Sequence, residues 1–559
     1  MDAAAPAPRD RLPARFARTG ADPDTTALVA DLRDDLSSAR YTVVDIEALW
    51  DRTAERASTH PGEALRRGHR VPAERALASA DDADRALAVL LRFLLLGRPV
   101  AAADLAAALP RLGVDGAIAL GLGASVAATE MATGAGADAR LVQPLIDLRP
   151  YAFADAAGDG EWWIASDPGE LSVGGALPED HVLGIGGAST TLSRLLLQRP
   201  ARRTLDLGTG SGIQALHAAR FSELVVATDI SERALALARF TAVLNDVDDR
   251  IEFRSGSLYE PVRGERFDRI VSNPPFVITP RTDGVPNYEY RDGGLVGDGI
   301  VEQVVRGAAD HLEPGGIAQF LANWEYRDGA DGLDRVVDWL ADTGLEYWII
   351  EREQQDPSEY AETWIRDGGT RPGTAEFEAL HAAWLDDFAQ RRVGSIGFGY
   401  VLLRRPEAGR APTLTRAERR HGAAGENPGG LGGHLELVLE ASDLVDALDD
   451  DGLRALALEV APDVTEERHH WPGAEQPTVI LLRQGGGFGR IVDAGTAIAA
   501  LVGAADGTLP LGVLSDAIAD LLEVDAAALW REVAPEVREL VHDGMLRPVD
   551  GAGDGEVGG

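Results

Sequence analysis

The chain has 559 residues, a formal net charge of -38 at pH 7 and a sequence pI near 4.6. It is therefore long enough for several domains and too acidic to adhere broadly to nucleic acid by neutralising phosphates. It has no cysteine, and none of its 53 basic residues is a lysine, which excludes disulfides, thiolate metal sites, Walker A phosphate loops and Schiff-base lysines.

The first segment, residues 1–24, is rich in alanine, proline and arginine. No apolar stretch follows it, so we interpret it as a disordered tail rather than a signal peptide. The longest apolar run, residues 86–97, contains Arg92 and is shorter than the ~20 apolar residues that span a bilayer. We therefore expect a cytoplasmic protein that does not enter a membrane.

Residues 25–181 are predicted to form a mainly helical amino-terminal domain, because apolar residues recur there every three or four positions. Three compact helices are followed by the strand-like segments Leu141–Leu148 and Glu161–Ala165. This order resembles a winged helix. A helical cap on the next domain is an equally good interpretation.

From residue 182 to residue 405, short β-rich runs alternate with helical segments, a pattern typical of a doubly wound α/β sheet. The seven expected strands are Thr204–Leu207, Leu224–Asp229, Ile251–Arg254, Arg269–Ser272, Ile317–Leu321, Tyr347–Glu351 and Phe398–Leu403. An insertion at residues 352–393, rich in aromatic and charged residues, separates the last two strands. We expect it to be helical and to serve as a substrate lid.

A glycine-rich loop follows the first of these strands. The sequence from Asp206 to Gly212 reads Asp-Leu-Gly-Thr-Gly-Ser-Gly, and glycines at alternate positions let the backbone turn sharply and a ligand approach closely. Dinucleotide enzymes use the spacing G-x-G-x-x-G, whose third glycine position is Ile213 here. The loop therefore disfavours NAD or FAD.

Two acids accompany this loop. Asp229 ends the second strand, where a carboxylate can accept both hydroxyls of a ribose. Asp206, at the entrance of the loop, suits the ammonium group of an amino acid. Together they predict a site for a ligand that is a nucleoside at one end and an amino acid at the other, although Asp229 alone could be a helix N-cap.

The fourth strand ends in Asn273-Pro274-Pro275-Phe276, at the edge of the sheet where α/β proteins bind ligands. The two prolines fix the backbone and leave carbonyl oxygens free to accept hydrogen bonds. If Asn273 and the Pro274 carbonyl accept two N–H bonds of a planar nitrogen, its lone pair can be aimed at a methyl donor. Phe276 would stack on the planar acceptor, and the structural alternative is an Asn-capped turn with a core phenylalanine.

The remaining chain divides into a linker, a domain and a tail. Residues 406–433 lack periodicity and are expected to be a solvated linker. Residues 434–550 should form a carboxyl-terminal domain with winged-helix-like helices at its end, and residues 551–559 a tail. The histidines have no metal-ligand spacing with acids, so no metal site is expected.

The motifs Asp206–Gly212, Asp229 and Asn273–Phe276 resemble the class I S-adenosylmethionine-dependent N-methyltransferases. This group includes release-factor glutamine methyltransferases and small-domain methyltransferases that act on adenine or guanine amino groups. The resemblance covers residues 182–405 and implies a Rossmann-like methyltransferase sheet with S-adenosyl-L-methionine as the cofactor. The residues that it assigns to the cofactor are Asp206, Gly208, Thr209, Gly210, Gly212, Asp229, Ile230, Ser257, Leu258 and Asn273.

One position departs from that family. Such enzymes usually carry an acid after the third strand for the adenine amino group, and this chain has Ser257 there. Adenine recognition at this position would therefore be weaker or come from backbone groups. By the same resemblance, Asn273 to Phe276 orient the methyl acceptor.

Three functions stay open at this point. The first is methylation of an adenine or guanine amino group, with a small preference for RNA over DNA because of the winged-helix-like flanks. The second is methylation of a glutamine in a translation factor or ribosomal protein, which the overall acidity favours. The third is a noncatalytic winged-helix interaction protein that retains the methyltransferase fold.

Overall fold

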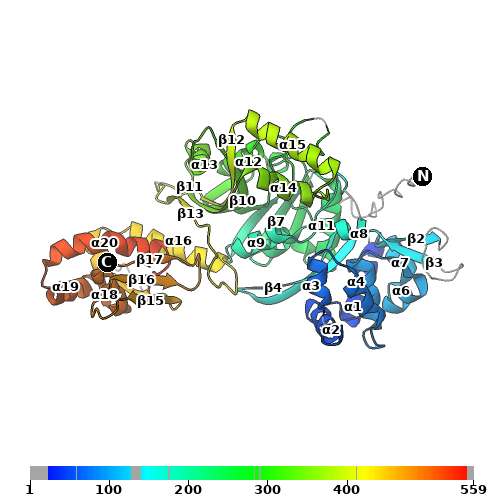
Figure 1. Cartoon of the computed structure of the whole chain (residues 1–559), viewed down its shortest axis with the longest axis horizontal. Coiled ribbons are helices and arrows are strands. Elements are labelled where there is room, and N and C mark those ends of the chain that lie inside the picture. Colours follow the sequence, from blue (N-terminus) through cyan, green and yellow to red (C-terminus); the bar gives the residue numbers. More distant parts are fainter. Residues whose placement is uncertain are drawn as a thin grey trace.

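The computed structural model describes residues 23–57, 59–127, 140–173, 177–282, 284–286, 288, 291–410 and 412–549. The expected tails lie outside these ranges, apart from Pro23 and Asp24, which begin the first helix. Figure 1 shows a central α/β part, with the amino-terminal helices at one end of the molecule and a carboxyl-terminal domain at the other. No helix of the described residues is long and apolar enough to cross a membrane.

The amino-terminal part is helical with one small sheet. Its elements are α1 (Pro23–Ser38), α2 (Val43–Ala57), α3 (Pro61–Arg66), α4 (Val71–Ala78), α5 (Arg85–Leu90), the π-helical turn η1 (Leu91–Leu95), β1 (Val100–Ala101), α6 (Ala102–Ala108), α7 (Gly113–Ala119), β2 (Gly123–Ala127) and β3 (Arg140–Pro144). Its buried core is continuous with Leu237 and Phe240 of the central part. Arg33 also donates to the backbone oxygen of Leu244 at 2.8 Å, so this part packs firmly on the centre.

The segment from α5 to β3 runs helix, strand, helix, helix, strand, strand, and its sheet has the order β1-β3-β2. Both segments that were expected to be strand-like do form strands, but they are not part of this three-stranded sheet as a unit. Leu141–Leu148 is divided between β3 and β4 (Asp147–Asp155), and Glu161–Ala165 lies in β5 (Gly158–Ser166), which pairs with β4 in a separate hairpin. An apolar run predicts a buried strand but does not indicate which other strand it pairs with. The winged-helix assignment of this unit stays a prediction.

The central sheet has eight strands in the order β13-β11-β12-β10-β9-β6-β7-β8. Their bounds are β6 (Ala201–Leu207), β7 (Ser222–Asp229), β8 (Ile251–Ser255), β9 (Phe267–Ser272), β10 (Leu312–Arg327), β11 (Glu346–Gln355), β12 (Val393–Arg404) and β13 (Thr415–Arg419). The strands β6 to β10 are parallel where they pair, and β12 is antiparallel to both of its neighbours. All seven expected strands are present, which confirms the α/β fold class.

The eighth strand, β13, lies in the segment that was expected to be a solvated linker. It pairs in parallel with β11, from Tyr347 opposite Thr415 to Glu351 opposite Arg419. Its sequence, Thr-Arg-Ala-Glu-Arg, has no apolar alternation because it forms the edge of the sheet. The linker prediction was wrong for these residues.

Helices cover both faces of this sheet. They are α9 (Gly187–Leu195), α10 (Ile213–Ala219), α11 (Glu232–Leu244), α12 (Gly299–His311) and α13 (Gly332–Leu340), with short 3-10 turns at Asp248–Arg250 and Glu260–Val262. The short helix α8 (Glu170–Val173) lies beside Gly97 of the amino-terminal part. Alternate strand residues bury against different helices, as the two-residue period of a strand requires. Ile270 joins the core with α12 and α13, whereas Val271 joins the core with α9.

The expected insertion forms α14 (Pro357–Asp367) and α15 (Ala375–Gln390). Its aromatic residues are buried against the chain that follows β9, with Tyr360 fully buried in that cluster. The Tyr360 hydroxyl accepts hydrogen bonds from the Ile278 backbone at 3.0 Å and from the Asn323 side chain at 2.9 Å. The insertion is thus a packed support for this segment.

The carboxyl-terminal domain contains α16 (Gly432–Asp446), α17 (Asp450–Ala455), β14 (Ala457–Val460), β15 (Val464–His469), β16 (Val479–Gln484), β17 (Ile491–Asp493), α18 (Thr496–Ala504), β18 (Asp506–Pro510), α19 (Leu511–Leu522), α20 (Ala526–His542) and β19 (Leu546–Pro548). Two three-stranded sheets, β18-β14-β19 and β15-β16-β17, pack with these helices around one core. The helix–strand–helix–helix–strand order from α18 to β19 resembles a winged helix, and that assignment also stays a prediction.

Candidate active site

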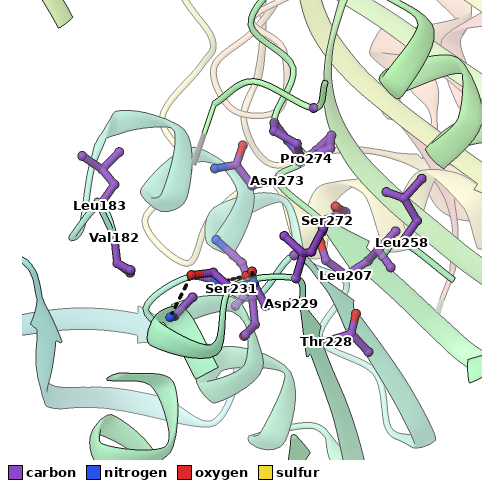
Figure 2. A pocket seen from close by; sticks show the side chains of 18 of the residues that line it. Val182, Leu183, Leu207, Thr228, Asp229, Ser231, Leu258, Ser272, Asn273 and Pro274 are labelled. Carbon is purple, nitrogen blue, oxygen red and sulfur yellow. Dashed lines mark hydrogen bonds between the residues drawn. The ribbon is translucent and has the colours of Figure 1, made fainter. Parts of the chain in front are cut away.

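The sheet reverses its direction of growth beside β6. The chain passes outward from β6 through β7 and β8, and then returns to the other side of β6 as β9. Loops that leave two strands in opposite directions open a crevice at their carboxyl ends, where α/β proteins bind ligands. A cavity of about 360 Å³ lies at this point, lined by residues that follow β6, β7, β8 and β9. Figure 2 shows it with Asn273 and Pro274 on one side and Asp229 and Ser231 on the other.

The glycine loop forms one wall of the cavity. Gly208, Gly210 and Gly212 have φ angles of 74°, 55° and 90°, which side chains rarely adopt. A Cβ atom on Gly208 or Gly210 would meet nothing within 4 Å, whereas one on Gly212 would lie 3.0 Å from the Cβ of Ala238. The first two glycines thus leave room at the cavity, and the third allows α10 to approach α11 closely.

Asp206 lies at the base of this loop and is fully buried. Its Oδ2 atom accepts a hydrogen bond of 2.6 Å from the Thr209 hydroxyl, and its Oδ1 atom has no partner among the described residues. Burial is the main reason that the pKa of Asp206 is raised to about 7; the Thr209 hydrogen bond opposes this rise and the charge of Asp229 adds to it.

Asp229, at the end of β7, holds the loop in place. One carboxylate oxygen accepts from the Gly210 backbone at 2.9 Å, and the other accepts from the Ser231 backbone at 2.9 Å. Burial raises the pKa of Asp229 in spite of these hydrogen bonds. Asp229 and the exposed Ile230 line the cavity, so the structure brings both to the predicted place.

The third strand contributes Gly256, Ser257 and Leu258 to the cavity. Leu258 has a φ of 47°, a left-handed conformation that is unusual for a leucine and directs the chain around the cavity. Ser257 lines the cavity where the resembling family usually has an acid for the adenine amino group.

The end of β9 forms the opposite wall. The Ser272 hydroxyl donates to the Leu207 oxygen at 2.6 Å and ties the ends of β9 and β6 together. Next to it, Asn273, Pro274 and Pro275 line the cavity. The Oδ1 atom of Asn273 is buried and has no hydrogen-bond partner in the described part of the chain. Figure 2 shows this side chain pointing away from Pro274, toward the side where Leu183 lies.

Phe276 is not among the described residues that line the cavity. It forms an isolated bridge with Asp292, and its ring meets that of Trp364 edge-on at 6.0 Å. This position is consistent with the alternative interpretation of Phe276 as a core residue. Stacking of Phe276 on a methyl acceptor stays a prediction. No residue of the insertion at 352–393 lines the cavity either, so the expected lid does not cover it.

Comparison with known families identifies the part of the chain that carries this cavity. The family model described as Methyltransferase small domain matches residues 184–329, which include the glycine loop and Asn273. The cavity therefore lies in the part of the chain that is similar to methyltransferase small domains. A second model, described as a domain of unknown function (DUF7059), matches residues 38–133 of the amino-terminal part.

Relatives with assigned names match part of this chain. The ribosomal protein uL3 glutamine methyltransferase of Bradyrhizobium diazoefficiens is 35% identical over 153 residues, which are 25% of this chain and 46% of that protein. A release factor glutamine methyltransferase of Xylella fastidiosa is 39% identical over 147 residues, which are 24% of this chain and 53% of that protein. The chain spans about half the length of these relatives.

Among solved structures, the ribosomal protein L11 methylase of Lactobacillus delbrueckii subsp. bulgaricus aligns with 43% of this chain and 84% of its own, at 20% identity and a TM-score of 0.24. That similarity is too low to support an argument. The family model and the relatives confirm the expected class of the domain, an S-adenosylmethionine-dependent methyltransferase, and with it the expected cofactor.

Several cavity residues of the methyltransferase domain were missed in the sequence. They are His181, Val182, Leu183, Gly184, Ser189, Gln214 and Asp292. The segment before β6 carries no motif, and only the fold brings it to the cavity. His181, whose Nδ1 atom lies 4.0 Å from the Asp167 carboxylate, is one of the histidines for which the sequence predicted only that they bind no metal. The only sequence signal for Gln214 is its place just after the glycine loop, which does not say where its side chain points.

The described residues contain no group of three or more His, Cys, Asp and Glu side chains placed to hold a metal ion. The expectation that the methyltransferase uses no metal stays a prediction.

Proposed function

We propose that this protein transfers a methyl group from S-adenosyl-L-methionine to the side-chain amide nitrogen of a glutamine in a translation protein. The observation that supports this most directly is the buried and unpartnered Oδ1 atom of Asn273, a residue that lines the cavity together with Pro274. A buried acceptor without a donor is unfavourable unless a ligand supplies the N–H group. Glutamine is the acceptor named for both relatives above.

The cavity fits the proposed cofactor. Gly208 and Gly210 leave space where side chains would stand, as a ligand close to the backbone requires. The unpartnered oxygen of Asp206 suits an ammonium group, and Asp229 at the end of β7 suits the ribose hydroxyls. In this proposal the methionine portion lies along Asp206, Gly208, Thr209, Gly210 and Gly212, and the adenosine portion along Asp229, Ile230, Ser257 and Leu258.

The main task of the protein is to align the acceptor. An amide nitrogen is a poor nucleophile because its lone pair is delocalised into the carbonyl group. We infer that Asn273 Oδ1 and the Pro274 carbonyl accept its two N–H bonds and turn its lone pair toward the methyl donor. The bound cofactor supplies an electrophilic methyl group on a sulfonium that leaves as a neutral thioether.

The transfer itself is a displacement. The nitrogen bonds to the methyl carbon as the carbon–sulfur bond breaks, and one amide proton then passes to solvent. Alignment of this kind can be worth ~7 to 11 kcal/mol in favourable cases. No covalent intermediate with the protein is needed.

The sequence-based preference for RNA is not supported by the relatives, and the charges of the flanking domains oppose it. In the amino-terminal unit, α6 and α7 carry Asp104 and Asp115 and no arginine. In the carboxyl-terminal unit, α19 carries two acids and no arginine, and the two arginines of α20 are outnumbered by its three glutamates. Helices that bind nucleic acid in winged-helix proteins need basic groups for the phosphates, so we propose a protein acceptor.

The noncatalytic alternative is also not favoured, because the relatives are named as enzymes and the cavity is open. We propose the domain boundaries 25–181, 182–405 and 434–550 for the whole chain, with β13 added to the central unit. Because translation proteins are the proposed acceptors, we place the protein in the cytoplasm as a further prediction.

An acceptor screen tests this proposal. The purified protein is incubated with methyl-labelled cofactor and separate pools of release factors, ribosomal proteins, tRNA, rRNA and DNA. We expect label only in a protein pool, and peptide mass spectrometry should place the methyl group on a glutamine side chain. Label confined to a nucleic acid pool would refute the glutamine assignment, and no transfer to any pool by folded, cofactor-binding protein would count against both acceptors.

A further inference from the structure

Gln214 is a buried side chain of the cavity that the proposed chemistry has not yet used. It is the second residue of α10, lines the cavity beside the glycine loop, and is only 3% exposed. Its Nε2 group donates to the backbone oxygen of Ser189 on α9 at 2.7 Å. Its Oε1 atom is buried and has no partner among the described residues.

The orientation of this amide follows from its partner. A backbone carbonyl can only accept a hydrogen bond, so the group that faces Ser189 must be the NH₂ end. The oxygen end is then left without a donor. Ser189 lines the same cavity, so α9 fixes the amide at the point where a ligand would meet it.

A second unpartnered acceptor lies close by. Asp206 Oδ1 is also buried without a hydrogen-bond partner in the described chain, and the Asp206 carboxylate lies near the backbone amide of Ala215, the residue after Gln214. One neutral amide oxygen and one carboxylate oxygen, each without a side-chain or backbone donor at hydrogen-bond distance among the described residues, match a cation with several N–H groups. The primary ammonium group of an amino acid has three such donors and one positive charge.

We propose that Gln214 determines specificity for the amino-acid end of the cofactor, with its Oε1 atom accepting a hydrogen bond from the ammonium group of the methionine portion. The carbonyl of Ser189 positions Gln214 for this contact. The inference rests on the proposed cofactor and adds a residue and a selectivity to it: the site should discriminate against ligands that have the adenosine portion but lack the ammonium group.

Two ligands and two variants test this inference by calorimetry. The ligands are S-adenosylmethionine and 5′-methylthioadenosine, which lacks the amino-acid end. The variants are Gln214→Met and, as a matched control, Gln319→Met. Gln319 is equally buried and also holds α9, but both ends of its amide are satisfied by Leu195 and Leu197.

We expect Gln214→Met to weaken the binding of S-adenosylmethionine by about ten- to hundredfold, the range for a hydrogen bond to a charged group, and to change 5′-methylthioadenosine binding by less than about twofold. Gln319→Met should lower the unfolding temperature and leave the affinities for both ligands nearly unchanged.

Equal weakening for both ligands, or no weakening for either, would overturn the role of Gln214. A Gln319→Met protein that loses the same selectivity would also overturn it, because the effect would then come from α9 as a whole. If the folded wild-type protein bound neither ligand, the proposed function would fall, and this result is distinct from a variant-specific failure.

Discussion

Three buried oxygen atoms without donors define the chemistry of the cavity: Asp206 Oδ1, Gln214 Oε1 and Asn273 Oδ1. Leaving a buried acceptor unsatisfied costs about 1 to 3 kcal/mol for each group. Gln214 and Asn273 line the cavity from α10 and from the end of β9, whereas Asp206 on β6 lies buried behind the glycine loop and is not among the lining residues. A ligand with several N–H groups would satisfy these oxygen atoms. Their lack of partners in the free protein is therefore consistent with a ligand-binding role.

Cofactor affinity should depend on pH through Asp206. The raised pKa of about 7 means that much of this carboxyl group is protonated below neutrality. An ammonium group is attracted by the charged form, so we expect S-adenosylmethionine to bind about tenfold more weakly near pH 6 than near pH 8. Calorimetry at the two pH values measures this. Asp206→Asn should bind weakly and show a flat profile, and an unchanged wild-type affinity would contradict the assignment.

Rising pH should have the opposite effect on the stability of the ligand-free protein: it strengthens cofactor binding but lowers the free energy of unfolding. An aspartate in the unfolded chain has an ordinary pKa of 3.8, whereas the pKa of folded Asp206 is about 7, so the folded state holds an extra proton between these values. The free energy of unfolding of the ligand-free protein should therefore fall as pH rises from about 4 to about 7, because protonated Asp206 favours the folded state only below its folded pKa. Comparing chemical unfolding of the wild type and Asp206→Asn across this range isolates that share. A difference that does not change with pH would contradict it.

Among single residues, the sequence allowed the prediction of site residues that stand at the end of an apolar strand. Asp206, Asp229 and Asn273 each lie at the end of such a strand, so the topology of a parallel sheet was enough to place them at one edge. Gln214 and His181 could not be assigned in the same way, because a single polar residue on a helix or loop has no pattern. Phe276 followed the pattern and still lies outside the cavity lining, since local spacing does not fix where a side chain points.

At the scale of elements, replacement of Gly212 in the turn from β6 to α10 by a residue with a side chain should lower the stability of the protein. Gly212 has a φ of 90°, and an added Cβ would lie 3.0 Å from Ala238 on α11. We expect Gly212→Ala to lose about 1 to 3 kcal/mol from backbone strain and a further ~1 to 3 kcal/mol from overlap of the two helices.

A matched control for that variant is Gly409→Ala. Gly409 has a φ of 87° and nothing within 4 Å of an added Cβ, so it shares the strain without the overlap. Urea unfolding compares the two variants. Equal losses would show that the close approach of α10 to α11 is not the constraint.

The sheet itself was largely predictable, because buried parallel strands read as short apolar runs with helices between them. Two regions were not. The strand β13 escaped notice because its residues are charged and lie at an edge, and its pairing with β11 is a long-range contact. The strands β4 and β5 were noticed as apolar runs, but their pairing with each other depends on tertiary structure.

At the scale of the whole molecule, β13 connects the methyltransferase domain to the carboxyl-terminal domain. Glu418 on β13 accepts two hydrogen bonds, of 2.6 and 2.8 Å, from the guanidinium group of Arg490. Arg490 is 2% exposed and belongs to the carboxyl-terminal domain. Burial would raise the pKa of Glu418, but the hydrogen bond from Arg490 and the charges of Arg416 and Arg490 lower it to about 2.

This ion pair should therefore stabilise the junction at neutral pH. We expect Glu418→Gln to lower stability by about 3 kcal/mol, because it leaves a buried guanidinium with only Asp543 as a charged partner among the described residues. Thermal unfolding measures the loss. The control Glu362→Gln breaks the exposed pair with Arg366 and should change stability by less than about 0.5 kcal/mol. Similar effects of the two changes would contradict the proposed importance of this junction.

The most direct test of the central claim compares methyl transfer and cofactor binding in Asn273→Ala. If Asn273 Oδ1 aligns a planar nitrogen, kcat/KM for the protein acceptor should fall at least about 100-fold while the Kd for S-adenosylmethionine changes by less than about threefold. Asn273→Asp, which retains oxygen acceptors, should keep more activity than the alanine variant. Full turnover by Asn273→Ala would contradict the account.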